Sequence, residues 1–396
     1  MGGSNMADKY LVEPDVGFIK EIGEYGGDSL KKCFQCATCS VACPISPDTK
    51  PFPRKEMIAA SWGLKDKLVG NGDIWLCHNC GDCSTLCPRG AKPGDVLAAI
   101  RSYAIAHYAG LPELGKIIND PKKLPVLAAI PAVLFLVLGL ILKIFGVHWL
   151  NFIPERVIEE GDAVGHIAHH AFFHTWLVDL IFVPTSIFVV AVFALGLKRF
   201  ITDMHQNALL EGKTDKQKID PKGFIEALIR VVPTILKHSK FSECGENSER
   251  GTPHMMVFFG FIGLAVVTGI FFVVLYGFGI HGPYKQYNPV KLLANVSGIA
   301  LFIGGLLMIK NRMAKSEDQV STYRDWFLIG LVFGLGATGM LTELTRLADA
   351  AFLTYVFYYI HLMFVFVLFI SLPFSKLAHL VYRTTAMAYN EYAGRK

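Results

Sequence analysis

The segment CFQCATCSVACP, residues 33–44, carries four of the nine cysteines in this chain of 396 residues. The same spacing returns in CHNCGDCSTLCP, residues 77–88, where every cysteine follows its counterpart by 44 positions. Both segments read C-x2-C-x2-C-x3-C-P, so eight of the nine cysteines belong to one motif used twice. The eight are Cys33, Cys36, Cys39, Cys43, Cys77, Cys80, Cys83 and Cys87.

This doubled spacing is the ligand pattern of bacterial ferredoxins that hold two [4Fe–4S] clusters. Three thiolates on one tight loop hold three corners of a cubane, and the fourth cysteine, followed by proline, reaches the other cluster. Disulfides are disfavoured in a reducing cytoplasm, and structural zinc usually pairs two C-x2-C elements. We therefore expect one cluster on Cys33, Cys36, Cys39 and Cys87, and the other on Cys77, Cys80, Cys83 and Cys43.

The sequence around the cysteines predicts an all-α cytoplasmic domain over residues 1–119. Residues 52–70 and 93–109 look helical, which favours an α-helical two-cluster ferredoxin over a small βαβ one. Residues 1–10 lack the apolar segment that export needs, and Cys244, alone in a polar loop, is interpreted as a free thiol. The net charge of +5 is small and dispersed, so no nucleic-acid partner is expected.

The composition changes abruptly after this domain. Only 18% of the chain is charged, against about a quarter in soluble proteins, and about 20 apolar residues cross a bilayer as a helix. We predict a transmembrane bundle over residues 124–382, then a tail over residues 383–396. The six helices of the bundle are expected at about 124–147, 172–197, 255–280, 292–309, 326–342 and 350–375.

Loop charges predict the orientation of these six helices. If the N-terminus is inside, the inside segments 198–253, 310–325 and 376–396 carry eighteen Lys and Arg residues, and the outside segments carry four. Positive loops stay on the cytoplasmic side. We expect a protein of the cytoplasmic (inner) membrane with both termini in the cytoplasm.

Three histidines are candidate axial ligands of two b haems. His361 and His379 are 18 residues apart, which is five helical turns, so they face one side of a helix about 27 Å apart. Ionisable residues within a membrane are functional candidates. His254, at the cytoplasmic mouth of the 255–280 run, shares the depth of His379, and these two predict a bis-histidine site.

The outer haem requires a partner for His361. His166, His170 and His174 fall at i, i+4 and i+8, which predicts one helical stripe at the outer end of the second membrane helix. His174 is the first choice because it should reach deepest, and His170 is the second. A hydrated cluster or a quinone site is the alternative interpretation of these residues.

The cysteine pattern of residues 33–88 resembles the small iron–sulfur subunit of heterodisulfide reductases. Residues 174–382 are similar to the haem b subunit of respiratory nitrate reductases, most closely in IHLM (360–363) and LPFSKLAH (372–379). The joined order resembles the membrane subunits of quinone-interacting membrane-bound oxidoreductases of sulfate reducers.

This resemblance implies ligand roles for three of the histidines. It places His254 and His379 on the cytoplasm-facing haem and His361 on the outer one. The nitrate reductase family has a second histidine where this chain has Leu264, so the outer haem must take its second ligand from elsewhere. The helix at 124–147 is additional to the five of that family.

The resemblance also implies a function. Menaquinol or menaquinone would exchange electrons through the haems and the clusters with a soluble partner, as a quinone-dependent oxidoreductase of sulfate respiration. The chain has no Gly-rich dinucleotide fingerprint, so the flavin would belong to heterodisulfide-reductase-like flavoprotein subunits, working with adenylylsulfate reductase. Rival interpretations are a sulfite-pathway or heterodisulfide reductase membrane subunit, or, from another class, an iron–sulfur-regulated transporter or scaffold.

Overall fold

The computed structural model describes residues 13–47, 51–157, 166–238, 245, 248–314 and 320–394, and Cys244 lies outside them. Within these residues the chain is helical, and its β structure is limited to two isolated bridges, Leu150 with Phe173 and Val157 with His166. The expected all-α fold, a two-cluster ferredoxin-like domain followed by six membrane-length helices, is confirmed.

Each of the six apolar runs forms a helix long and apolar enough to cross a membrane. Most are longer than expected, because polar residues continue the helices past the apolar segments. The greatest extension is in the second helix, α11, which runs well beyond residue 197. The six helices are α9 (Leu124–Ile144), α11 (Thr175–Leu210), α13 (Gly251–Phe278), α14 (Pro289–Met313), α15 (Tyr323–Leu347) and α16 (Ala351–Ser371).

The N-terminal domain consists of short helices around one longer helix, α7. The α7 helix starts with Pro93, whose missing N–H is not needed in a first turn, and ends at Gly110 with φ of 69°. The elements are α1 (Val16–Ile22), η1 (Gly23–Gly27), η2 (Asp28–Lys32), α2 (Thr38–Val41), α3 (Arg54–Ser61), α4 (Lys65–Val69), α5 (Asp73–Leu76), α6 (Asp82–Thr85), α7 (Pro93–Ala109), α8 (Pro112–Asn119) and η3 (Pro121–Lys123).

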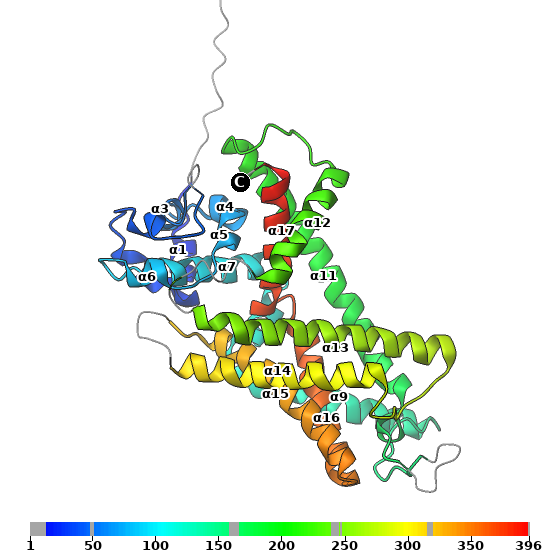
Figure 1. Ribbon diagram of the computed structural model, residues 1–396. Helices are drawn as coiled ribbons and strands as arrows, with labels where there is room; N and C mark the ends of the chain where they lie inside the picture. Colours follow the sequence, from blue (N-terminus) through cyan, green and yellow to red (C-terminus); the bar gives the residue numbers. More distant parts are fainter. Residues whose placement is uncertain are drawn as a thin grey trace, which may run out of the picture.

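The remaining elements connect the two parts of the chain. Figure 1 shows the blue N-terminal domain at one end of the bundle, with the red helix α17 between it and α12. Packing of α17 against both α5 and α12 explains this position. These elements are α10 (His169–Phe172), α12 (Pro221–Lys237), η5 (Ser248–Arg250), η6 (Lys376–Ala378) and α17 (His379–Tyr392).

One hydrophobic core joins the N-terminal domain to the helices that leave the membrane bundle. Trp75 stacks on Tyr382 of α17 at 5.4 Å between ring centroids, and Tyr108 of α7 contacts Phe200 of α11 at 5.2 Å. All four side chains are almost completely buried. Burial of aromatic side chains contributes strongly to stability, so this core holds the cysteine motifs in a fixed position relative to the bundle.

Candidate functional site

The two cysteine loops have the same backbone conformation as well as the same spacing. Gln35 and Asn79 have positive φ, and so do Ala37 and Gly81, at 71° and 108° respectively. Each pair is 44 positions apart, and each loop leads into a one-turn helix, α2 or α6. Positive φ is uncommon for residues with a side chain. The recurrence of positive φ at matched positions shows that both loops have the same backbone conformation.

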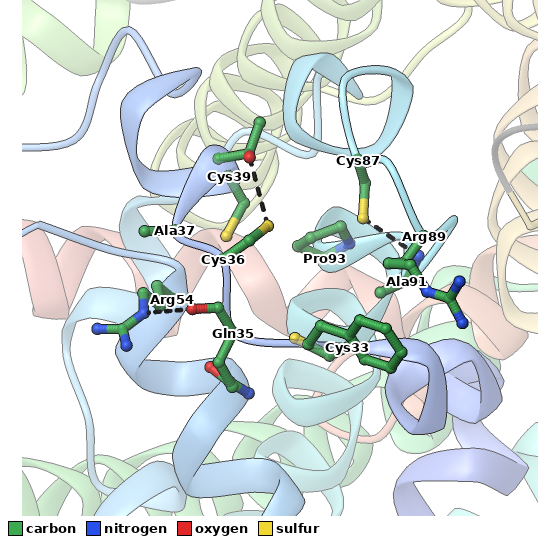
Figure 2. A pocket seen from close by; sticks show the side chains of 12 residues that line it. Cys33, Gln35, Cys36, Ala37, Cys39, Arg54, Cys87, Arg89, Ala91 and Pro93 are labelled. Atoms are coloured by element: carbon green, nitrogen blue, oxygen red, sulfur yellow. Dashed lines mark hydrogen bonds between the residues drawn. The ribbon is translucent and has the colours of Figure 1, made fainter.

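The first group of cysteines surrounds one cavity, and the fourth member comes from the second motif. Figure 2 shows Cys33, Cys36, Cys39 and Cys87 at the rim of this cavity. The Cys36 sulfur lies 3.3 Å from the Thr38 hydroxyl, and the Ala91 amide donates to the Cys87 sulfur at 3.4 Å. Hydrogen bonds to sulfur tune iron–sulfur clusters, so these contacts suit cluster ligands.

The second group mirrors the first. Burial raises the pKa of Cys43 to about 12, and the nearby Cys77 and Cys80 add to the rise. Burial also raises the pKa of Cys83, and Cys77, Cys80 and Cys43 all contribute by repulsion between thiolates. The thiol of Cys43 thus lies among the cysteines of the other motif, just as Cys87 lies among those of the first.

The first group has the arrangement that a multi-atom cluster requires. Its four cysteines line one cavity. Among the described residues, no three His, Cys, Asp or Glu side chains are grouped as the ligands of a single metal ion. Burial, followed by repulsion from the nearby Cys33, raises the pKa of Cys39 to about 11. Cluster binding would require these thiols to lose their protons, and the iron would supply the positive charge that favours the thiolates.

Two arginines that sequence reasoning missed contact the second cysteine loop. Arg383 of α17 donates to the carbonyl oxygens of Cys77 at 3.3 Å and Leu76 at 3.4 Å. Arg250, just before α13, donates to the carbonyl oxygen of Asn79 at 3.3 Å. In the sequence, both arginines belong to the positively charged segments that are assigned to the inside. No sequence pattern indicates that either arginine contacts the second cysteine loop, which is far away along the chain. The second loop therefore lies against α17 and the segment that leads into α13.

The structure brings His379 and His254 into the same neighbourhood. Burial lowers the pKa of His379 to about 3, and the nearby His254 ring contributes, so the imidazole is neutral. The His379 Nδ1–H donates to the carbonyl oxygen of Lys376 at 2.5 Å. A neutral imidazole that donates through Nδ1 presents an unprotonated Nε2, which is the state that binds a metal.

His254 has a partner that the sequence analysis did not consider. Its Nδ1 lies 3.0 Å from Nε2 of His238, and the Nδ1 of His238 lies 3.3 Å from the carbonyl oxygen of Leu236. If His238 donates to that carbonyl, its Nε2 accepts from His254 Nδ1–H. This chain of hydrogen bonds gives His254 the same tautomer as His379.

The expectation that His361 and His379 share one continuous helix is wrong, because α16 ends at Ser371 and α17 begins at His379. His361 is nevertheless oriented in the same way within the bundle. The Thr338 hydroxyl donates to the carbonyl oxygen of Gly334 at 2.6 Å, so it accepts from Nδ1–H of His361 at 2.9 Å. A Cβ on Gly339 would lie 3.2 Å from the His361 ring. Glycine at position 339 therefore leaves space for the imidazole ring of His361. All three predicted ligands present Nε2 in the form that fits haem iron.

The expected stripe of His166, His170 and His174 is wrong. Helix α10 ends at Phe172 and α11 begins at Thr175, so the three residues do not share a helix. The cause is tertiary: the amide of Asn151 donates to the carbonyl oxygen of Phe172 at 3.0 Å, and this pairing holds Phe173 and His174 in extended conformations.

The first and second choices for the outer ligand have other contacts. His174 caps α11, where its Nδ1 accepts from the amide of Trp176 at 3.3 Å, and its ring stacks on Trp149. The ring of His170 lies 5.9 Å from that of His281.

Comparison with known families divides the chain into two parts. Residues 29–91 match the family described as 4Fe-4S dicluster domain, and residues 238–395 match the family described as Citrate utilization protein B. The first match covers both cysteine loops, and the second begins at His238 and includes His254, His361 and His379.

Similar curated proteins are subunits of heterodisulfide reductases. A subunit of the H2:CoB-CoM heterodisulfide,ferredoxin reductase of Methanothermobacter marburgensis is 39% identical over 90 residues, 23% of this chain and 49% of that one. A subunit of the H2/formate:CoB-CoM heterodisulfide,ferredoxin reductase of Methanococcus maripaludis is 37% identical over 100 residues, 23% of this chain and 54% of that one.

A third relative agrees with these two. An iron-sulfur subunit of the CoB–CoM heterodisulfide reductase of Methanocaldococcus jannaschii is 35% identical over 107 residues, 25% of this chain and 57% of that one. The chain spans about half the length of the curated relatives it matches. No solved structure matches it. The N-terminal part is therefore an iron–sulfur domain like that of these heterodisulfide reductase subunits, typical of electron-transfer subunits of oxidoreductases.

Proposed function

We propose that this chain is a membrane electron-transfer subunit that exchanges electrons between the menaquinone pool and a cytoplasmic partner containing flavin and iron–sulfur centres. One observation carries the proposal. Helix α17 begins at His379, which we assign to a haem, and four residues later Arg383 contacts the loop of Cys77. Residues i and i+4 share a helix face, so one helix joins the haem site to a cluster site.

The chain's own residues define two kinds of cofactor site. The crossed cysteine groups, one ending in Cys87 and the other in Cys43, would hold two [4Fe–4S] clusters. His254 and His379 would ligate the inner b haem, and His361 would ligate the outer one. When bound, haems and clusters each carry one electron, so together they divide the two-electron oxidation of a quinol into single steps.

The orientation proposed for the chain follows from its charges. Arg383, Arg250 and Lys376 all belong to segments on the side of the N-terminal domain, and positive segments favour the cytoplasmic side. Both termini would then lie in the cytoplasm, with the clusters accessible to a soluble partner at the face of the cytoplasmic (inner) membrane.

The proposed partners rest on the resemblance and on the relatives. Because similar proteins are subunits of heterodisulfide reductase complexes, heterodisulfide-reductase-like flavoprotein subunits are the proposed neighbours. Adenylylsulfate reductase is the proposed soluble redox partner, in dissimilatory sulfate reduction. The same relatives favour a second candidate, a heterodisulfide reductase membrane subunit that uses another lipid-soluble carrier such as methanophenazine.

The test is cofactor analysis of the purified protein, followed by reduction with a menaquinol analogue. We expect about eight cluster irons, two b haems, and reduction of haem and clusters by the quinol. His254→Ala and His379→Ala should each remove the same low-spin haem and leave the other in place. A protein without haem would overturn the proposal, and reduction by a phenazine carrier alone would favour the second candidate.

A further inference from the structure

His169 is a half-buried histidine at the outer side of the bundle that has no role so far. Its Nε2 is sealed from solvent and has no hydrogen-bond partner among the described residues. Buried polar atoms are nearly always hydrogen-bonded, and an unsatisfied one is costly. A nitrogen in this position therefore requires an explanation, and one explanation is a group that the chain binds.

The aromatic residues around His169 belong to the same helix as His361. The short helix α10 packs against α16, and the His169 ring lies 4.7 Å, between centroids, from the ring of Tyr358. Tyr358 precedes His361 by three residues on α16 and so shares its helix face. Phe172, at the other end of α10, stacks on Tyr355 at 5.3 Å. Two aromatic contacts thus fix α10 on the helix that carries His361.

Charged side chains surround His169. Arg346, Lys291 and Glu343 all lie near enough to act on its ring. The cations both bind Glu343, with Arg346 NH2 and Lys291 Nζ each 2.8 Å from a carboxylate oxygen. Two cations on one carboxylate leave an excess of positive charge, which suits a ligand that carries carboxylates of its own.

The other outer histidines are less suited to bind a metal. His174 accepts a hydrogen bond at Nδ1 from Trp176 N–H, so in the neutral ring the proton sits on Nε2 and neither nitrogen keeps a free lone pair. The His170 ring lies beside the ring of His281.

We propose that His169 and His361 are the two axial ligands of the outer b haem. Each would donate a nitrogen lone pair to the iron, and no other bond forms or breaks. This inference rests on the proposed function, because it requires a second haem. It replaces His174 and His170 as the partner of His361, and it accounts for the loss of the family's expected histidine at Leu264.

The first experiment is a haem count and low-spin spectrum on purified full-length variants. His169→Ala should lower the haem content from two per chain to one and remove the same spectral component as His361→Ala. The neighbouring His170→Ala and the cap variant His174→Ala are the matched controls, and both should keep two haems. Two haems with an unchanged spectrum in His169→Ala would overturn the assignment.

A second pair of variants keeps the test decisive if the alanine variant does not fold. His169→Gly should regain the low-spin spectrum on addition of imidazole, because free imidazole can fill the vacated position. His169→Met retains a ligand atom and should raise the midpoint potential of the outer haem only, since methionine ligation raises haem potentials. A parent with one haem would overturn this inference alone, whereas a parent with none would overturn the proposed function too.

Discussion

The two cysteine loops are copies in sequence and in backbone, but their surroundings differ. The first loop carries the exposed Cys36, and its carbonyl at Gln35 is contacted by Arg54, an exposed residue of its own domain. The second loop receives Arg383 and Arg250 from the membrane part. Identical ligand spacing therefore does not make identical redox centres. The second loop is held by residues that flank the membrane helices, whereas the first is contacted by its own domain; under the proposed function, the second would exchange electrons with the bundle and the first with a soluble partner.

The largest expected effect concerns the crossed fourth ligands. Cys33→Ser and Cys87→Ser should remove the same cluster, although the residues belong to different motifs, because both line the cavity of Figure 2. Cys43→Ser should remove the other cluster. Electron paramagnetic resonance of the reduced variants measures this. One shared signal lost in both Cys33→Ser and Cys43→Ser would contradict the crossing.

The cluster-free protein should show a difference between the two cysteine groups, represented by Cys36 of the first group and Cys43 of the second, as different alkylation rates. The Thr38 hydroxyl lowers the pKa of the exposed Cys36, whereas burial raises the pKa of Cys43 to about 12. The thiolate is the reactive form, so the alkylation rate of Cys43 should keep rising about tenfold per pH unit up to about pH 11, while the rate of Cys36 should level off at a lower pH. Anaerobic alkylation read by mass spectrometry should give rates at least about a hundredfold apart at pH 8. Equal rates would mean that the two cysteine groups are equally open to solvent.

Replacing Arg383 should alter the second cluster without removing it. Arg383→Gln deletes a half-buried positive charge beside the loop of Cys77. Loss of about 1.4 kcal/mol of interaction corresponds to about 59 mV for a one-electron carrier, and the midpoint potential should fall. Arg54→Gln is the matched control beside the first loop. The substitution at Arg54 should shift the midpoint potential of the first cluster by about a third of that amount or less, because solvent screens an exposed charge. Redox titration that shows equal shifts would remove the distinction between the loops.

The smallest expected effect concerns the backbone conformation that the two loops share. Gly81→Ala places a side chain at φ of 108°, which should cost about 1 kcal/mol and speed loss of the second cluster to a chelator about fivefold. Ala37→Gly at the matching position should change the first cluster's loss rate by less, because reduced strain is offset by greater freedom of the unfolded chain. Bleaching of the visible absorption follows both rates. A larger effect at Ala37 would show that the loops are not equivalent.

Much of the architecture could be predicted from local patterns. Cysteine spacing located both loops, and runs of apolar residues located all six membrane-length helices. These signals succeed because ligand spacing and hydrophobic length depend only on neighbours along the chain. The end of α11 was missed because polar residues up to Leu210 continue the helix outside the apolar segment.

Contacts across long separations could not be predicted in this way. In sequence, Arg383 is one more positive charge in the tail, and only the return of α17 to the N-terminal domain places it on Cys77. The histidine stripe failed for the same reason, because pairing of Asn151 with Phe172 interrupts the expected helix. His169 had no distinguishing pattern beside His170, and its burial depends on α16.

The shared core of Trp75, Tyr108, Phe200 and Tyr382 has a consequence for how this molecule can be divided. A cut after residue 119 would follow the change in sequence character but would leave Trp75 and Tyr108 exposed to water, so a water-soluble fragment of the cysteine domain should aggregate. The same core removes any hinge between the cysteine loops and α17. Under the proposed function, the distance that an electron must tunnel would then be set by packed side chains, and the transfer rate within the chain should not depend on solvent viscosity.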